Sequence, residues 1–378
     1  MRVLFTANPL LGHLLPLVPL ARAALAEGHE VVIASGPDLV NQIERRGFRS
    51  WSIGPPLAEI EAGVRARPQS EDESEFERLA GQGTAMFGRP AVARALDLRR
   101  LTADWVPDLV VSEVYELGGA YASGRLRVLH GLGAHFPGFV PLARTAAGAV
   151  LDALGEPPVV VDLADIPYLD PWPEALQPPG DRPFSEVLPL RPHAGEVLDG
   201  ERLPAAFERL LAAPSVYLTL GTVFNDPATF RDPLLALAEL DVNVVVTCGL
   251  DLAAASMSDL PANVAVAPFV PQALLLPRVS AVVSHAGAGT LVGGLLHGLP
   301  QVCLPQGADQ FVNAEQVARV GAAVVLLPDQ VTPEAIRDAT RQVLTDPSYA
   351  AAARAMSTEL AAMPSAAEVL TALLQRSR

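Results

Sequence analysis

The sequence predicts an α/β protein with two Rossmann-like, doubly wound halves that face each other across a cleft. Three observations support this prediction. The chain has 378 residues, which suits two domains of roughly 150–200 residues each. Short apolar runs that end in turn residues alternate with longer Ala- and Leu-rich stretches, a pattern typical of parallel strands covered by helices. The alternation occurs twice, on either side of a proline-crowded segment at residues 156–204.

The first half opens with a short apolar run at residues 2–7, which predicts a buried strand. After a loop, the apolar, Ala-rich stretch at 16–26 predicts a helix that stops at Gly28. Similar short runs predict three further strands, at residues 29–35, 108–112 and 127–131. Two segments are expected to lack regular structure: the acidic run at 71–75, as a solvated loop, and the proline-rich segment, as a linker or irregular surface loops.

The second half repeats the pattern with more strands. A helix is expected near residues 232–240, and the tail is expected to be helical from Pro333, with a break at Pro364. The predicted strands are residues 215–220, 243–248, 264–267, 281–284, 301–304 and 323–326. The predicted divisions are a first domain at 1–190, a linker at 191–213, a second domain at 214–360, and a last helix at 361–378 that packs back on the first domain.

Composition excludes several classes of protein. Half of the residues are apolar, so the chain can fill two cores and extensive disorder is not expected. The net charge of −15 argues against nucleic acids and anionic membranes as partners. No lysine is present, which excludes a Schiff-base lysine and a phosphate loop of the GxxxxGK type.

The first residues show no charged segment followed by an apolar one, so we expect no secretion leader, and no apolar run reaches the ~18 residues that span a membrane. We therefore expect a soluble, cytoplasmic protein. Cys248 and Cys303 lie in separate apolar runs, and buried, reduced thiols are the expectation for both.

A strand, a turn of small residues and a helix follow one another around residues 285–290, His-Ala-Gly-Ala-Gly-Thr. Glycine and alanine let a ligand approach the backbone, and the free N–H groups at a helix start bind phosphate. His285 and Thr290 can add side-chain donors. The segment is therefore either an anion-binding cradle or a tight turn in which the glycines serve geometry alone.

His13 follows the first predicted strand, just before the first helix. Open α/β sheets bind their ligands at the carboxyl ends of strands, and histidine titrates close to neutral pH. His13 is thus a candidate general base for a hydroxyl nucleophile. The alternative is a histidine that only makes local hydrogen bonds at a helix start.

Five motifs in order complete the second-half pattern: VPQ at 270–272, SHAGAGT at 284–290, LHGLP at 296–300, LPQGADQ at 304–310 and NAEQ at 313–316. Together they resemble the nucleotide-sugar signature of family 1 glycosyltransferases, most closely the bacterial antibiotic and macrolide branch. The resemblance is dense in the second half, good in the first strand-loop-helix and weak between. It implies the GT-B fold, with an acceptor-binding first domain and a second domain that binds the nucleotide sugar.

The resemblance also implies roles for individual residues. The nucleotide base would meet the backbone around Val270 and Gln272, and the sugar hydroxyls would meet Asp309 and Gln310. The diphosphate would be held by Gly221, Thr222, His285, Gly287, Ala288, Gly289 and Thr290.

One departure concerns the nucleotide. Many relatives that use uridine donors carry a ribose-binding glutamate eight residues after the histidine, and Gly293 stands there. This favours a thymidine diphosphate donor, whose sugar lacks the 2′-hydroxyl. No Asp-x-Asp triplet is present, so we expect no metal and no cofactor; the helix N–H groups and His285 would take the metal's place.

On the acceptor side, the family commonly orients its histidine base with an aspartate. Glu113 stands there, one methylene longer, and could instead be a carboxylate that caps a helix start. The candidates for the acceptor pocket are Leu11, Met86, Phe87, His135 and Phe136, for which core packing is the alternative.

We therefore predict an inverting, metal-independent transfer of a sugar from a nucleoside diphosphate to a small apolar natural product, by a protein that is either a monomer or a homodimer. Three other functions remain open: a silent nucleotide-sugar-binding auxiliary protein, a nucleotide-sugar epimerase, and a nicotinamide enzyme. The last is disfavoured because the first loop lacks GxGxxG.

Overall fold

The computed structural model describes residues 1–67, 81–135, 163–180, 183–221, 227–249 and 260–376, with isolated residues at 78, 144, 148–150, 152–153 and 155. The acidic run at 71–75 lies outside the described residues. Contacts divide the chain into two units. Unit 1 comprises Met1–Trp172, Pro179–Arg191 and Pro364–Arg378, and unit 2 comprises Pro173–Pro178 and Pro192–Met363.

Unit 1 contains a seven-stranded sheet in the order β3-β2-β1-β4-β5-β6-β7, in which every neighbouring pair is parallel. Its strands are β1 (Arg2–Thr6), β2 (Glu30–Ser35), β3 (Arg49–Ser52), β4 (Leu109–Glu113), β5 (Leu126–His130), β6 (Tyr168–Asp170) and β7 (Val187–Pro189). The four strands expected in this half are confirmed as β1, β2, β4 and β5.

The expectation that residues 156–204 hold no regular structure was wrong. β6 and β7 lie in this segment and extend the sheet beyond β5. Proline is compatible with both strands because of where it falls. Pro167 and Pro171 flank β6, and Pro189 ends β7, the edge strand, where a missing N–H breaks no ladder in the sheet interior.

Side chains alternate between the two faces of the unit 1 sheet. Val3 and Phe5 of β1 belong to a core shared with α2 and α15, whereas Leu4 packs with Leu98 and Trp105 on the opposite face. The helices of unit 1 are α1 (Leu11–Leu14), α2 (Val18–Ala26), α3 (Val40–Glu44), α4 (Leu57–Arg65), α6 (Arg89–Leu101) and α15 (Ala366–Arg376). Its short helical turns are η1 (Leu15–Leu17), η2 (Pro37–Leu39), η3 (Thr84–Gly88), η4 (Gly119–Tyr121) and η5 (Leu163–Asp165).

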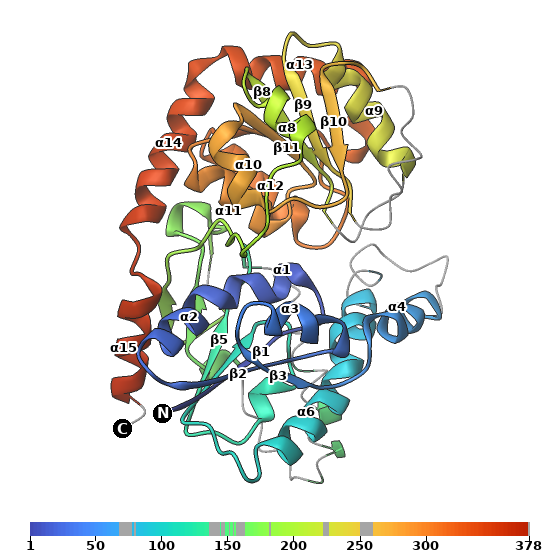
Figure 1. Ribbon diagram of the computed structural model, residues 1–378. Helices are drawn as coiled ribbons and strands as arrows, with labels where there is room; N and C mark the ends of the chain where they lie inside the picture. Colours follow the sequence, from blue (N-terminus) through green and yellow to red (C-terminus); the bar gives the residue numbers. More distant parts are fainter. Residues whose placement is uncertain are drawn as a thin grey trace. The chain divides into compact units, whose positions relative to one another are not determined.

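The last helix, α15, belongs to unit 1 although the chain reaches it only after unit 2. It lies beside α2, as the red and blue ends of the chain in Figure 1 illustrate. Its apolar side chains are buried in the same core as Leu17 and Leu20; they are Val369, Leu370, Leu373 and Leu374.

Unit 2 contains a six-stranded sheet in the order β10-β9-β8-β11-β12-β13, again with parallel pairs throughout (Figure 1). Its strands confirm all six expected in this half: β8 (Ser215–Thr219), β9 (Asn243–Thr247), β10 (Val264–Ala267), β11 (Ala281–Ser284), β12 (Gln301–Cys303) and β13 (Ala323–Val325).

Helices cover both faces of this sheet. Val216 and Leu218 of β8 pack with α9 and α13, while Tyr217 packs with α8 and α10. The helices are α8 (Ala205–Leu210), α9 (Pro227–Ala238), α10 (Gln272–Leu275), α11 (Ala288–Leu296), α12 (Gln310–Arg319), α13 (Pro333–Thr345) and α14 (Pro347–Ala362). The short turns are η6 (Glu174–Leu176), η8 (Leu276–Arg278) and η9 (Pro328–Gln330).

The segment expected to be a linker, 191–213, differs from that expectation in part. It contains α8, which belongs to unit 2 because Phe207 is fully buried in its core. Cys248 and Cys303 are free thiols and both are buried, as expected. In the part of the chain that the structure describes, no helix is long and apolar enough to cross a membrane.

Candidate active site

The predicted site residues of each unit lie where the strand order changes direction. In unit 1, β1 lies between β2 and β4; in unit 2, β8 lies between β9 and β11. The connections that leave two such adjacent strands diverge to opposite faces of a parallel sheet, and the crevice between them binds ligands. His13 and Glu113 lie at the carboxyl ends of β1 and β4, and Gly221 and His285 at those of β8 and β11.

His13 and Glu113 are in direct contact. His13 lies in the one-turn helix α1, and its Nδ1 is 2.8 Å from Oε1 of Glu113. The glutamate side chain is completely buried, whereas that of the histidine is 16% exposed. A solvent-facing base thus rests on a buried carboxylate, and the extra methylene of glutamate does not prevent the contact.

The carboxylate of Glu113 accepts further hydrogen bonds. Oε1 also accepts from the backbone N–H of Asn8 at 3.3 Å and from the Asn8 side-chain amide, and Oε2 accepts from the Tyr115 N–H at 2.7 Å. Glu113 therefore also closes the turn that follows β4, so both functions expected of it from the sequence are compatible. Burial favours a higher pKa for Glu113, but the positive charge of His13 and these hydrogen bonds bring the pKa below its ordinary value.

These contacts fix the proton arrangement of His13. A carboxylate only accepts hydrogen bonds, so Nδ1 of His13 carries the proton that points to Glu113. Nε2 is then the acceptor nitrogen. This arrangement is that of a general base whose imidazolium form is stabilised by a buried carboxylate.

Aromatic rings surround the imidazole of His13. Its ring centroid lies 5.6 Å from that of Phe87 and 6.2 Å from that of Tyr115, and these two rings stack at 5.2 Å. Met86 and Phe87 lie in the π-helical turn η3, and both are half-buried, as is Leu11 at the start of α1. The base is therefore accessible beside apolar surface.

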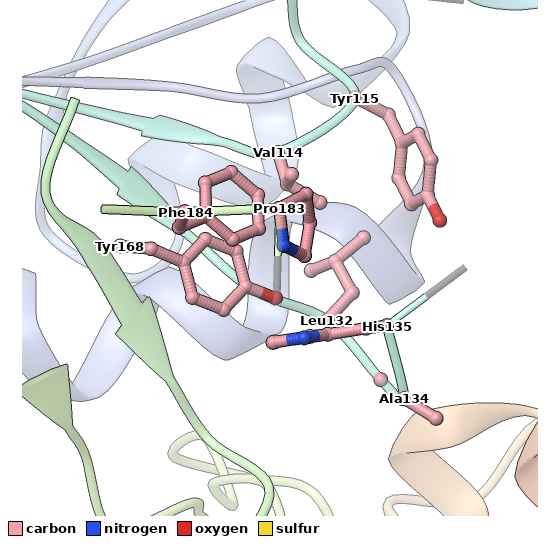
Figure 2. Close-up of a pocket in the computed structure, with 9 residues that line it drawn as sticks. Val114, Tyr115, Leu132, Ala134, His135, Tyr168, Pro183 and Phe184 are labelled. Atoms are coloured by element: carbon pink, nitrogen blue, oxygen red, sulfur yellow. The ribbon is translucent and has the colours of Figure 1, made fainter. Parts of the chain in front are cut away.

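A small, open pocket is lined in part by Tyr115 (Figure 2). Tyr168 and Phe184 stack at 4.0 Å on one side of it, and His135 contributes an imidazole that lies 3.5 Å from the buried carboxylate of Asp170. The lining also includes Val114, Leu132, Gly133, Ala134 and Pro183. His135 thus lines an apolar pocket near His13, whereas Phe136 lies outside the described residues.

In unit 2, the imidazole of His285 lies against two glycines. A Cβ atom placed on Gly221 would be 2.7 Å from its Nε2, and one placed on Gly287 would also collide with it. Gly221 has a φ of +83°, a conformation that favours glycine in any case. Burial lowers the pKa of His285 to about 4, so the ring is neutral at pH 7, and its buried Nδ1 has no hydrogen-bond partner.

The first turn of α11 starts beside this histidine. Its N-cap residue is Gly287, and no side chain caps the turn. Gly289 is exposed, with open space around the position of a Cβ. The backbone N–H groups of the first turn, from Ala288 to Thr290, are therefore available to bind an anion. Thr222, the remaining residue predicted for the diphosphate, lies outside the described residues.

Gln272 reaches the same turn from the first residue of α10. Its side-chain amide donates to the hydroxyl oxygen of Thr290 at 2.9 Å and lies 3.5 Å from the hydroxyl of Tyr217. Val270 is buried in the core of unit 2, which leaves only backbone for a nucleotide base, while the adjacent Phe269 is 46% exposed.

Asp309 and Gln310, the two residues predicted to bind the sugar, lie in different environments. Asp309 is half-buried at the N-cap of α12, and one of its oxygens accepts from Asn313 at 2.8 Å. Gln310 is only 4% exposed, and its amide oxygen accepts from the N–H groups of Gln306 and Gly307. Gln310 therefore shapes this loop, and only its NH₂ group is left for a ligand.

Several residues of the site escaped the sequence analysis. Asn8 and Arg94 stand behind Glu113, and Tyr115, Tyr168 and Phe184 line the pocket. For Asn8 a signal existed, because it is a polar residue directly after the first strand. Tyr168 and Phe184 lie in the segment expected to be irregular, and Arg94 lies in a helix that was not predicted. Tyr115 follows a predicted strand, but no local pattern marked it as a pocket residue. Among the described residues, no group of three His, Cys, Asp or Glu side chains is arranged to hold a metal ion.

Comparison with known proteins places these features in context. Residues 232–375 match the family model described as "Erythromycin biosynthesis protein CIII-like, C-terminal domain". L-demethylnoviosyl transferase of Streptomyces niveus is 31% identical over 400 residues, covering 100% of this chain and 99% of the relative. 10-deoxymethynolide desosaminyltransferase of Streptomyces venezuelae is also 31% identical, covering 99% of this chain and 96% of the relative.

Solved structures agree over the whole chain. The glycosyltransferase VinC in complex with dTDP is 27% identical with a TM-score of 0.75, covering 100% of both chains. The spinosyn rhamnosyltransferase SpnG complexed with spinosyn aglycone is 28% identical with a TM-score of 0.80, covering 99% of this chain and 100% of the other.

Proposed function

Because the chain belongs to the bacterial antibiotic glycosyltransferases of the GT-B fold, we propose that it transfers a deoxysugar from a nucleoside diphosphate to a hydroxyl of a small apolar aglycone of the polyketide type. The relatives named above are sugar transferases. The observation that carries the proposal for this chain is the contact between His13 and the buried carboxylate of Glu113.

The acceptor hydroxyl would lie against Nε2 of His13, with the apolar body of the aglycone in the pocket beside Tyr115. Nε2 takes the hydroxyl proton, and the acceptor oxygen attacks the anomeric carbon. The bond from this carbon to the diphosphate oxygen breaks, and its electron pair leaves with the diphosphate. Attack from the face opposite the leaving group inverts the anomeric centre.

The leaving diphosphate would be bound at the start of α11. Uncapped N–H groups in that turn and the positive end of the helix dipole stabilise negative charge without a metal ion. His285 lies at the same turn and would donate once it is protonated. We therefore propose that the transfer needs neither a metal nor a cofactor, and that the nucleotide sugar is consumed as a co-substrate.

Thymidine diphosphate is the proposed nucleotide. Gly293 is buried in α11, and a Cβ at this position would be 2.9 Å from Cδ1 of Leu276. The side chain that would bind a ribose 2′-hydroxyl is thus lacking, and Leu276 already fills part of its space. A site of this kind loses nothing when the 2′-hydroxyl is missing.

The test is a transfer assay with thymidine and uridine diphosphate sugars, with and without EDTA, on a panel of polyketide aglycones. Product should form from the thymidine diphosphate sugar in the presence of EDTA. NMR of the product should show an anomeric configuration opposite to that of the donor. His13→Ala should abolish product while the dissociation constant for thymidine diphosphate stays within about two-fold, since His13 belongs to unit 1. Unchanged turnover of His13→Ala would refute the assignment, and isomerised donor without acceptor would identify an epimerase.

A further inference from the structure

A buried polar chain continues behind the carboxylate of Glu113. The side-chain NH₂ of Asn8 donates to Oε1 of Glu113, and the side-chain oxygen of Asn8 accepts from Nη1 of Arg94. Asn8, Arg94 and Glu113 are each at most 1% exposed. This chain of hydrogen bonds therefore runs from the guanidinium of Arg94 through the amide of Asn8 and the carboxylate of Glu113 to the imidazole of His13.

The fold provides a specific space for Arg94 in α6. A Cβ atom on Gly54 would be 2.6 Å from Cγ of Arg94, and one on Gly118 would be 2.8 Å from its Cβ. Gly54 has a φ of +67°, so both its conformation and its lack of a side chain serve this contact. Despite complete burial, Nε and Nη2 of Arg94 have no hydrogen-bond partner. An arginine retained in this costly environment has a role beyond packing.

Arg94 determines which way the amide of Asn8 points. In the orientation described, both contacts join a donor to an acceptor. If the amide were turned over, its NH₂ would face the guanidinium and its oxygen would face the carboxylate, which are two repulsive contacts. Arg94 thus ensures that Asn8 always presents a donor to Glu113.

The titratable groups around Glu113 come from four elements. They are His13 on α1, Arg94 on α6, His130 on β5 and Glu116 in the turn after β4. Glu116 is fully buried and accepts from the N–H groups of Gly118 and Gly119. Burial raises the pKa of Glu116, and the positive charge of Arg94 opposes that rise. Arg94 is therefore the fixed cation of this cluster.

We propose that Asn8 and Arg94 are positioning residues for the base: they hold the carboxylate of Glu113 in the place from which it supports His13. The inference rests on the proposed role of His13. The side chain of Glu113 is fixed at both oxygens of its carboxylate, by Asn8 at Oε1 and by Tyr115 at Oε2.

The test compares Asn8→Ala, Arg94→Met and Arg94→Lys in the full chain. Arg94→Met removes a positive charge that acts on Glu113, so Glu113 should support the imidazolium of His13 more strongly, and the acidic limb of the kcat/KM profile should move to higher pH by about half a unit or more. Asn8→Ala should move it the same way, because Glu113 loses a donor. Both should lower kcat by about ten-fold with little change in the KM of the acceptor. Arg94→Lys keeps the positive charge, so the acidic limb of its kcat/KM profile should lie at the same pH as that of the unaltered protein.

Arg46→Met is the matched control, because Arg46 is also a buried arginine of unit 1 and donates to the backbone and side-chain oxygens of Gln42, four residues earlier. It should lower the melting temperature without moving the limb. The double variant Asn8→Ala/Arg94→Met should lose no more kcat than the worse single variant, since both act through one amide. Additive losses, or melting shifts with an unchanged profile, would overturn the inference while His13→Ala still tests the proposed function. If Arg94→Met does not fold, Asn8→Ala and Arg94→Lys decide the question.

Discussion

The imidazole of His13 lies 2.8 Å from the Glu113 carboxylate, which no solvent reaches. The contact joins residues 100 positions apart, and it depends on β1 and β4 being neighbours in the sheet. Because the carboxylate is dry and multiply hydrogen-bonded, it cannot move away from the histidine without leaving donors unpaired. The base is therefore oriented before any substrate arrives.

Two substitutions of Glu113 should distinguish the effect of its negative charge from the effect of its side-chain length. Glu113→Gln keeps the volume but not the negative charge that supports the imidazolium, and kcat should fall by about 100-fold or more. Glu113→Asp keeps the charge but shortens the side chain, and we expect a loss of about ten-fold. Steady-state kinetics would measure both, with thymidine diphosphate affinity as the control. Full activity of Glu113→Gln would contradict the assigned role.

Binding of the diphosphate should be linked to proton uptake. Burial lowers the pKa of His285 to about 4, so the free protein carries this ring neutral, and a bound diphosphate favours the charged ring. Calorimetric titration with thymidine diphosphate at about pH 7.5, in buffers of different ionisation enthalpy, should reveal the uptake. His285→Asn should bind more weakly and without buffer dependence. Equal heats in all buffers for the unaltered protein would contradict the linkage.

His130 should make unit 1 sensitive to acid. It is 1% exposed at the end of β5, and burial lowers its pKa to about 4. Its stabilising contribution is complete above the ordinary pKa of about 6.5 and is lost as the pH falls from there toward 4, because the unfolded chain then binds the extra proton. The loss is about 3 kcal/mol per group at the lower end.

Urea unfolding of His130→Leu across this pH range should therefore show a shallower decline in stability than the unaltered protein. An equivalent change at the exposed His193 provides the control and should leave the slope unchanged. An identical slope for His130→Leu would exclude His130 as a source of acid sensitivity.

A substitution in the pocket wall should change the binding of the acceptor and not that of the donor. Phe184 stacks on Tyr168 at the pocket wall, whereas the rings beside His13 are those of Phe87 and Tyr115. Phe184→Ala removes apolar surface from the pocket proposed for the aglycone and should raise the KM of the acceptor by about ten-fold with a smaller effect on kcat. Initial-rate measurements with varied acceptor and saturating donor provide the test. A change confined to the KM of the donor would place the aglycone elsewhere.

The sequence revealed those parts of the molecule whose signals are local. Most strands with an apolar run were found, as were the glycines of the β11–α11 turn, because backbone geometry restricts which residues occur in turns. β3 was missed, although Gly47 precedes it and Gly54 follows it, because its four residues form no apolar run. β6 and β7 were missed because three-residue strands between prolines carry no periodicity. The partners of Glu113 were missed for a different reason. Asn8 lies 105 positions from Glu113 and Arg94 lies 86 positions from Asn8, so only the packed fold brings them together.

The place of α15 bears on how the protein can be made and recombined. Both termini belong to unit 1, and unit 2 is essentially one continuous insertion, residues 192–363, with a short contribution from 173–178. A ribosome therefore releases unit 2 in full before the residues that complete the core of unit 1, so the part synthesised first matures last. Chimeras that exchange unit 2 must likewise leave residues 364–378 with unit 1, or the new hybrid will inherit a mismatched α2–α15 contact.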